Sequence, residues 1–348
     1  MAADENMTNR PRPADAAGQE ADGVDRGAVR RARDRRAAPP AHVHLRPRAV
    51  ADLVPILARR FLGELEPGSP MPTVRSLAGQ LHSSLASIHV AITRLEEAGA
   101  IEFETRGRAG ALLVDRSLGS LWSIAEGGPL VIAMPLASSE RYEALATALK
   151  QVMTEAGLDI FFIFVRGSRQ RLQAMHDGRC HLAVMSSFAA GEVCGPDEAL
   201  VAELLPLSYN TGHRVFFVPG RKPAVPLRVI IDRSSADQQL LTNIEFADPQ
   251  VRLVPAMYSQ IVRLLETGAA DAAVWTVDEM DARRSPALTG RPMSEMAQRR
   301  VGDRDTRAAL VGAAADAAAL RALASVLIPE RVEAIQHDVM SGRLVAEY

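Results

Sequence analysis

The chain has 348 residues, enough for two or three domains, with 47% hydrophobic and 24% charged residues and a net charge of −2. This charge balance excludes a protein that holds nucleic acid over its whole surface, so any such binding must be local. No apolar run approaches the ~18 residues that a membrane helix needs, and two cysteines exclude a disulfide framework, so we expect a cytoplasmic protein without membrane contact.

Residues 1–40 contain few large apolar side chains and are rich in Ala, Arg, Asp, Gly and Pro. Such a segment cannot bury enough surface to order itself, so we expect a disordered tail. Its arginines cluster between positions 26 and 36. Two interpretations stay open: a solvated tail, or a basic arm along a phosphate backbone that adds affinity without sequence choice.

Three amphipathic segments follow, because apolar residues recur at helical spacing over 50–62, 74–81 and 85–95. Thr73 and Ser84 directly precede the second and third segments, where each predicts an N-cap that accepts a hydrogen bond from a backbone N–H. The sequence therefore predicts three helices, the last two joined by a tight turn.

A hairpin is predicted after the third helix. Gly99 is expected to end that helix in a left-handed conformation. Short apolar runs at 101–106 and 111–114 flank the basic, glycine-rich tip 107–110. Three helices followed by such a hairpin predict a winged helix-turn-helix over residues 45–116.

The polar residues of this domain favour DNA binding over a purely structural role. A small helical bundle would show the same apolar spacing, but it would not need exposed polar residues on its third helix or a basic wing tip. We expect double-stranded DNA as the partner, with the third helix in a major groove. For His89 the alternatives are a base contact and a solvent-facing position. The candidate DNA-binding residues are Arg75, Ser84, Ser87, His89, Thr93, Arg94, Arg106 and Arg108.

Two motifs carry a family resemblance over Leu53 to Val114. They are MPTVRSLA at 71–78, and the set Ser84, Ser87-Ile88, Ala91-Ile92, Leu95 and Gly99-Ala100-Ile101. Both resemble the DNA-binding domain of GntR-type regulators, which implies that Arg75 contacts DNA. Leu85 stands where that family usually has an arginine, and His89 stands where it often has another. The loss of both arginines implies weaker base readout.

The larger part of the chain, residues 128–348, alternates apolar strands with helical stretches after a predicted linker at Gly127-Gly128-Pro129. The sequence RLQAMHDGRCHLAVM at 171–185 is echoed without a gap by IVRLLETGAADAAVW at 261–275. This pattern predicts an α/β domain with mainly parallel sheets and two similar lobes, the second at about 210–295. Clefts between lobes are places where small molecules bind.

The larger half is similar to the type II periplasmic-binding-protein fold, on the strand, helix and Gly-x-x-Asp-x-Ala-Val cadence at 268–274. Together with the GntR-like head it resembles the small YhfZ-type group of regulators. The resemblance implies a multidomain α/β protein: an N-terminal winged helix-turn-helix plus a two-lobed, periplasmic-binding-protein-like (type II) effector domain.

Serine-bearing loops follow several of the predicted strands. In such sheets ligands lie off the carboxyl ends of strands, against helix N-termini. Serines at helix starts are ordinarily caps, but four such loops, two with arginine, suit a small anionic or hydroxylated metabolite. We expect Arg166 and Arg233, one from each half, to meet on one anion. The candidate ligand-binding residues are Ser138, Ser139, Arg166, Ser168, Ser186, Ser187, Asp232, Ser234, Ser235, and also Tyr258 and Trp275, each either core or pocket wall.

Catalytic and metal-binding motifs are absent from the sequence: it contains no nucleophile elbow, Walker loop, His-Glu-x-x-His or dinucleotide fingerprint, and no Cys–His cluster. We expect no enzyme and no cofactor, and interpret His176, His181 and His213 as ordinary polar residues. The sequence predicts a ligand-responsive transcription regulator that acts as a homodimer, because one winged helix covers too few base pairs for a genome-scale address. Alternatives are an enzyme, a ligand-free dimerisation scaffold on the same fold, or a solute-binding protein.

Overall fold

The computed structural model describes residues 49–107, 110–283 and 285–348. The expectations for the 1–40 tail and for Arg108 lie outside these residues. Within the described ranges, no helix combines the length and the apolar character that a membrane crossing requires.

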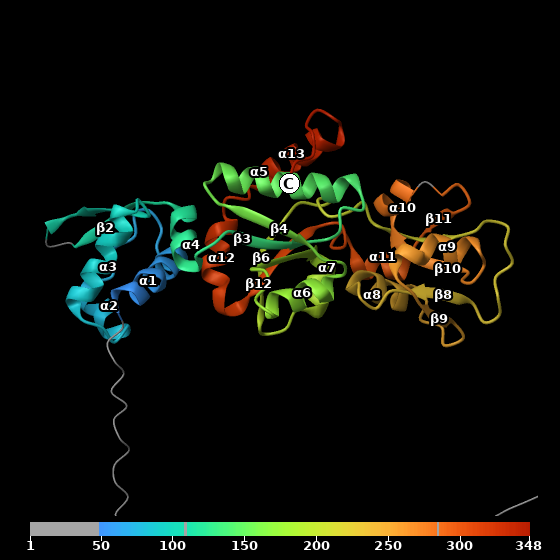
Figure 1. Cartoon of the computed structure of the whole chain (residues 1–348). Coiled ribbons are helices and arrows are strands. Elements are labelled where there is room, and N and C mark those ends of the chain that lie inside the picture. Colours follow the sequence, from blue (N-terminus) through green and yellow to red (C-terminus); the bar gives the residue numbers. More distant parts are fainter. Residues whose placement is uncertain (1–48, 108–109, 284) are drawn as a thin grey trace, which may run out of the picture. The chain divides into compact units, whose positions relative to one another are not determined.

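The first part of the described chain is the predicted winged helix-turn-helix, here called the head (Figure 1). Its elements are α1 (Val50–Glu64), α2 (Val74–Gln80), α3 (Leu85–Glu97), β1 (Ile101–Thr105) and β2 (Ala111–Arg116). Both predicted N-caps are confirmed, since Thr73 Oγ1 accepts from the backbone N–H of Ser76 at 3.1 Å and Ser84 Oγ accepts from that of Ser87 at 2.9 Å. Gly99 has a φ of +64°, the left-handed conformation predicted at the end of α3.

The hairpin of the head is tied to α1 by one arginine. Arg116, at the end of β2, donates to the carbonyls of Phe61 at 3.2 Å and Leu62 at 2.8 Å. The last carbonyls of a helix lack partners within the helix and carry a partial negative charge, so a guanidinium there is favourable. The hairpin is thereby fixed relative to the three helices.

The sequence analysis missed one helix between the head and the first lobe. Gly127 ends this helix, α4 (Leu118–Glu126), with a φ of +71°, and residues 127–129 of the predicted linker join it to the first strand of the lobe. Ser117 caps the start of α4 by accepting from the backbone N–H of Ser120 at 3.2 Å, and Trp122 is buried on its inner face. The serine before Leu118, Leu121 and Trp122 was the available signal, but the segment is only nine residues long.

The head packs directly on this helix and on α12 (Ala317–Ala324). A side chain at Gly63 of α1 would place its Cβ only 3.0 Å from the Cβ of Ala318, so the two backbones approach closely there. Arg59 of α1 forms ion pairs with Glu126 of α4 and with Asp316, the residue before α12. One continuous apolar core joins these elements.

Two five-stranded sheets with the same internal order form the rest of the chain. The first lobe contains β4 (Ile160–Phe164), β3 (Leu130–Met134), β5 (Leu182–Ser186), β12 (Ala308–Ala313) and β6 (Glu198–Glu203), in this order. The second contains β9 (Arg252–Pro255), β8 (Arg228–Ile231), β10 (Ala272–Thr276), β7 (His213–Phe217) and β11 (Thr289–Pro292). In each sheet the first three strands are parallel, and the fourth is antiparallel to both of its neighbours. The predicted pair of similar α/β lobes is confirmed.

Helices pack against both sheets (Figure 1). The remaining α-helices are α5 (Glu140–Glu155), α6 (Ser168–His176), α7 (Ser187–Val193), α8 (Ala236–Glu245), α9 (Ile261–Glu266), α10 (Val277–Arg283), α11 (Glu295–Val301) and α13 (Pro329–Met340). Helix α13 packs on α5, and the lobes carry separate apolar clusters besides the shared one.

The internal repeat of the sequence corresponds to a repeated structural unit. Strands β5 and β10, which end the two echoed segments, are the central strands of their sheets. The residue before each strand plays the same role: His181 Nδ1 accepts from the backbone N–H of Val131, and Asp271 Oδ2 from that of Arg228, both at 2.9 Å. The alignment of a histidine with an aspartate is therefore explained by a shared acceptor position.

The chain crosses between the two lobes twice, after β6 and after α11. The crossing segments, residues 204–212 and 302–307, are called the hinge here. They are bonded to each other: the backbone N–H of Tyr209 donates to the carbonyl of Thr306 at 2.8 Å, and Asn210 Nδ2 donates to the carbonyl of Asp305 at 3.0 Å. The two crossing segments of the hinge are thus hydrogen-bonded to each other.

Candidate functional site

The predicted DNA-binding residues of α2 and α3 differ in their solvent exposure and in whether their side chains are already hydrogen-bonded. Arg75 on α2, and His89 and Arg94 on α3, are exposed, whereas Thr93 is half-buried. Ser84 and Ser87 bond to each other, with their hydroxyl oxygens 2.8 Å apart, and Ser84 also caps the helix. Their hydroxyls are thus engaged in holding the start of α3.

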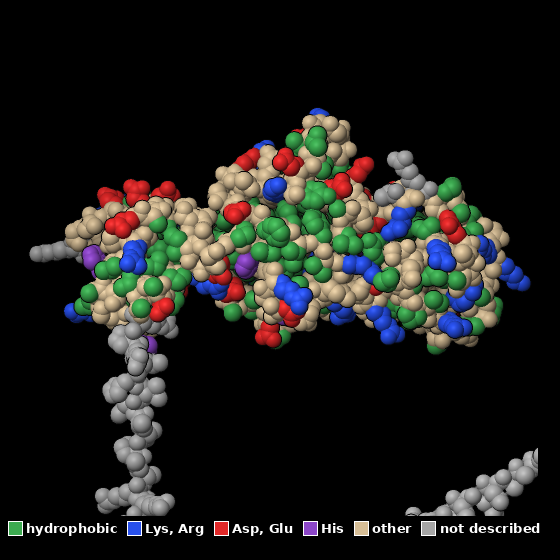
Figure 2. Space-filling view, in the orientation of Figure 1, with side chains coloured by type: hydrophobic (Ala, Val, Ile, Leu, Met, Phe, Trp, Pro, Cys, Tyr) green, Lys and Arg blue, Asp and Glu red, His purple; other side chains and the backbone are tan. Residues whose placement is uncertain are grey.

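The wing carries a second predicted contact. Arg106 at the base of the hairpin tip is exposed and pairs with Glu104 at 3.1 Å. Exposed pairs of this kind contribute little energy, so a phosphate can replace the carboxylate at small cost. On the face shown in Figure 2, the head carries acidic side chains along one edge and only isolated basic ones.

A cleft lies between the two lobes, at the loops where the sequence predicted a ligand. It holds about 570 Å³ of empty space, including its open mouth. Of the predicted residues, those that line it are Arg166, Ser168, Asp232, Ser234, Ser235, Tyr258 and Trp275. Arg233, which we expected to face Arg166, is exposed and lies outside this lining.

Arg166 connects the two lobes across the cleft. From the loop after β4 it pairs with Asp232 in the loop after β8, and it also donates to Ser234 Oγ at 3.2 Å. Its guanidinium carbon lies 4.9 Å from the ring centre of Tyr258, a cation–π distance. Among the described residues, Arg166 Nε is one of the few buried side-chain nitrogens without a hydrogen-bond acceptor. Arg166 itself lines the cleft, so this N–H is a candidate donor to an acceptor bound there.

Backbone contacts next to Arg166 bring the lobes close together. Ser168 Oγ accepts from the backbone N–H of Ala236, the first residue of α8, at 3.1 Å. Gly167 has a φ of +81°, and a Cβ there would lie 2.3 Å from the carbonyl oxygen of Ser234. Only glycine therefore permits this approach of the two loops.

Two buried carboxylates also line the cleft, and serines from the opposite lobe donate to them. Ser186 donates to Asp237 of α8, and Ser138 donates to Glu279 of α10. Burial raises the pKa of both carboxyl groups above their ordinary values. Ser138 and Ser186 thus do not line the cleft themselves but hold the carboxylates that do.

The remaining predicted residues divide between caps and the pocket wall. Ser139 is the buried N-cap of α5, and Ser187 donates to Glu203, so neither lines the cleft. Tyr258 and Trp275 stack with parallel rings, 5.5 Å between centres, and both line the cleft. Trp275 is also buried in a core cluster of the second lobe, so both interpretations of this residue hold.

Sequence reasoning missed several lining residues. Arg171 on α6 is buried and donates to the carbonyls of Val184 and Val165 and to the hydroxyl of Tyr209. These partners lie up to 38 positions away, so its role could not be deduced from the local pattern. Others in the lining that the sequence analysis did not select are Tyr142, Asn210, His213, Asp237, Gln238, Thr276 and Glu279.

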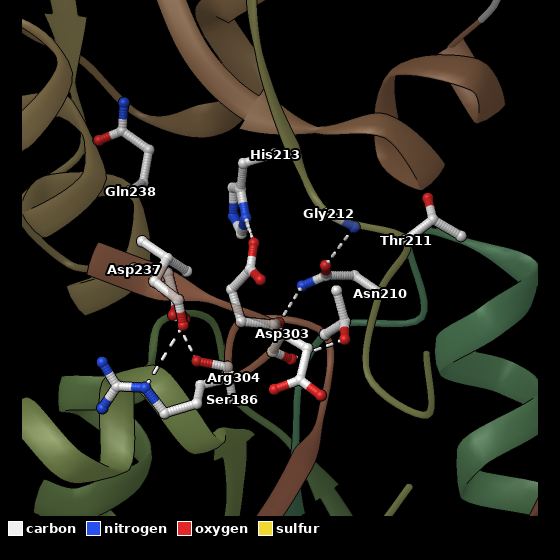
Figure 3. A network of polar contacts seen from close by, with 12 residues as sticks. Ser186, Asn210, Thr211, Gly212, His213, Asp237, Gln238, Asp303 and Arg304 are labelled. Atoms are coloured by element: carbon white, nitrogen blue, oxygen red, sulfur yellow. Dashed lines mark hydrogen bonds and ion pairs between the residues drawn. The ribbon is translucent and has the colours of Figure 1, made fainter. Parts of the chain in front are cut away.

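His213 is not an ordinary polar residue, as the sequence analysis supposed. Its side chain is buried at the start of β7, where Nδ1 lies 2.8 Å from Asp305 Oδ2 of the hinge. Figure 3 shows it beside the hinge residues, where the backbone N–H of Gly212 donates to Asn210 Oδ1 at 2.7 Å. Burial alone would lower the pKa of His213, but the hydrogen bond and charge of Asp305, with the charges of two cleft carboxylates, raise it.

We expect the free energy of unfolding to fall as the pH rises above about 6.5. A histidine whose pKa is higher in the folded chain stabilises fully below its unfolded pKa and loses that contribution as the pH rises through the folded value. The raised pKa values of Asp237 and Glu279 also make the free energy of unfolding fall as the pH rises, starting at lower pH. A variant is therefore needed to separate the contribution of His213 from that of the two carboxyl groups. Urea unfolding of His213→Gln should show a smaller fall above pH 6.5 than the wild type, whereas His176→Gln, at an exposed histidine that pairs with the half-buried Glu198, should keep the wild-type fall. Identical pH profiles of wild type and His213→Gln would contradict this account.

Two family models match this chain. Residues 118–348 match the YhfZ C-terminal domain, and residues 61–110 match the gntR family of bacterial regulatory proteins. The second match contains α2 and α3, the helix pair of the head.

Individual proteins agree with these matches. An uncharacterized protein, YhfZ of Escherichia coli (strain K12), is 30% identical over 244 residues, which are 70% of this chain and 80% of that protein. The crystal structure of YhfZ from Shigella flexneri aligns with a TM-score of 0.55 at 26% identity and covers 66% of this chain and 98% of that one. The chain therefore belongs to the YhfZ family, with a gntR-family DNA-binding head followed by the YhfZ C-terminal domain.

Proposed function

We propose that this protein is a transcription regulator that binds an operator through its head and responds to a small metabolite in its cleft. The observation that carries the proposal is the cleft itself, where charged groups of both lobes meet beside buried polar atoms that have no partner among the described residues. Such a site can bind a ligand with both lobes at once, and the gntR-family head is a DNA-binding domain. We further propose that the cleft binds its ligand without transforming it, and that the protein acts in the cytoplasm.

The ligand chemistry follows from the groups that the cleft offers. A carboxylate or phosphate suits Arg166, because its Nε–H is buried without an acceptor. The hydroxyl of Thr276 is also buried and has no partner in the described part of the chain, and Asp237 and Glu279 are acceptors for hydroxyl groups. These features support a small metabolite with one anionic group and one or more hydroxyl groups.

The proposed response is a change in the angle between the lobes. A ligand shifts such an equilibrium only by its difference in affinity for the two states. Contacts that cross the cleft, such as Arg166 with Asp232, exist only when the lobes are close. A ligand that adds contacts to both lobes therefore favours the closed state, and one that separates Arg166 from Asp232 favours an open state.

The movement can reach the DNA-binding residues through the joint between head and first lobe. Helix α1 of the head packs on α4 and α12, and its Arg59 pairs with Glu126 of α4 and with Asp316, the residue before α12. The head is therefore packed against the first lobe and is not joined to it by a flexible linker alone. We propose that lobe closure changes the orientation of paired heads.

We propose a homodimer as the DNA-binding form, because a single winged helix covers too few base pairs. The outer strand of the first sheet supports a contact between two copies. Strand β4 is an edge strand that pairs only with β3 among the described strands, and it exposes Phe161 and Phe164, at 55% and 38%. Apolar edge strands are usually covered, and a second copy would cover this one.

Replacing Arg75 by alanine should weaken binding to all duplexes alike, because an exposed arginine on α2 suits a phosphate contact and not base choice. Removing one phosphate contact should reduce the slope of log affinity against log salt by about one. Fluorescence anisotropy with duplex DNA at several salt concentrations measures both effects. Arg179→Ala, at an exposed arginine of the first lobe, is the control and should bind like wild type. Unchanged affinity and slope in Arg75→Ala would remove this role.

A further inference from the structure

Helix α3 presents an apolar surface where a base-reading helix would be expected to present polar groups. Its inner face is buried through Ile88, Ala91, Ile92 and Leu95. On its other side, Leu85 is 51% exposed and Val90 is 43% exposed, both within the first two turns. We call Leu85, Ala86, His89 and Val90, all exposed, the reading face.

Few polar groups of this region are free to read a base. The hydroxyls of Ser84 and Ser87 bond to each other and to the start of the helix. Only His89 is both polar and exposed within the reading face. Hydrogen-bonded readout by the first two turns is therefore restricted to one side chain.

Exposed leucines and valines are common on protein surfaces and by themselves indicate nothing. Their position is informative here, because the gntR-family match includes α3 and the first residues of a recognition helix contact base edges. In the major groove, the C5 methyl group of thymine is the apolar group that a base pair presents. Apolar side chains at this place therefore match thymine in chemistry as well as in position.

We propose that Leu85 and Val90 are specificity-determining residues that read thymine methyl groups in the major groove of the operator. The two side chains lie five positions apart on α3 and flank Ala86 and His89, so they contact different base pairs. The inference goes beyond effector sensing and rests only on DNA binding by the head. It requires T·A or A·T pairs at defined positions of each half-site.

The test begins with the full-length protein and a randomised duplex library, from which bound duplexes are selected and sequenced. The enriched duplex is then synthesised with deoxyuridine in place of thymidine, one position at a time, which removes only the methyl group. Burying one methyl-sized group is worth about 0.8 kcal/mol, so each contacted thymine should lose about fourfold in affinity. Thymines outside the contact should show no change.

Variants assign each methyl group to a side chain. Leu85→Ala should lose the deoxyuridine effect at one set of positions and Val90→Ala at another, and both sites are exposed, so folding should be retained. Val114→Ala is the matched control, because Val114 is 46% exposed on β2 of the same head and lies outside α3. It should keep the wild-type pattern.

The outcomes separate this inference from the proposed function. Enrichment without any loss on deoxyuridine substitution, or the same loss in wild type and both α3 variants, would overturn the inference and leave DNA binding intact. A library without any enrichment would contradict sequence-specific DNA recognition and this inference together. A loss at thymines that disappears in Leu85→Ala or Val90→Ala supports it.

Discussion

Replacing Arg166 by alanine is expected to abolish the stabilisation of this protein by small anionic metabolites. The substitution removes the free Nε–H of the cleft and leaves Asp232, which is buried, without its guanidinium partner. Hydrogen bonds to charged groups contribute about 1.5–3 kcal/mol, so the free energy of unfolding should fall by about that amount. Thermal-shift and urea-unfolding measurements on the full chain, with a panel of carboxylates and sugar phosphates, test both effects.

Two further variants show whether the effect belongs to the position. Arg169→Ala removes a neighbouring, exposed arginine and should behave like wild type. Arg166→Lys keeps the charge but not the planar fork, so it should retain part of the stability and little of the anion response. An Arg166→Ala protein that is still stabilised by the same compounds would show that the anion binds elsewhere.

Replacing Arg59 by alanine is expected to separate DNA binding from the ligand response. Arg59 lies on α1, outside the predicted DNA-binding residues, and pairs with Glu126 and Asp316 at the joint to the first lobe. Its loss should leave DNA affinity without ligand within about twofold of wild type. Typical couplings between sites change affinity about 5- to 150-fold, and we expect most of that change to be lost.

The neighbouring arginine is a control of the same type on the same helix. Arg60 pairs with Glu64 and contacts Gln80, both within the head, so Arg60→Ala should keep the ligand response. Fluorescence anisotropy with the enriched duplex, with and without a stabilising metabolite, compares the two variants. If Arg59→Ala responds to ligand like wild type, the joint does not transmit the lobe movement.

The head could be predicted from the sequence because its signals are local. Caps at Thr73 and Ser84, the apolar spacing of α1 to α3 and the left-handed Gly99 each depend on residues within a few positions. Such signals act through the backbone of one helix and need no knowledge of distant contacts.

The two lobes were predictable for a different reason. The gap-free echo that ends at β5 and β10 shows the same unit twice, and strand-end loops are where α/β sheets bind ligands. Arg166, Ser168, Asp232 and Ser234 do line one cleft. Ser139 and Ser187 do not, because capping serines occupy the same loops.

The remaining features depend on contacts between segments far apart in the chain. The pairing of His213 with Asp305 joins positions 92 residues apart, and Ser138 with Glu279 joins positions 141 apart. No local pattern distinguishes such a histidine or serine from a surface residue. The short helix α4 was missed for a related reason, since its inner face becomes apolar core only when α1 packs on it.

The most direct test of the account measures DNA affinity and cleft binding in one experiment. A metabolite from the panel that raises the melting temperature of the full-length wild type is titrated into its complex with the enriched duplex, followed by fluorescence anisotropy. The account predicts a change in DNA affinity of at least about fivefold in wild type and none in Arg166→Ala. A compound that stabilises the wild type through Arg166 but leaves its DNA affinity unchanged would contradict a ligand-responsive regulator.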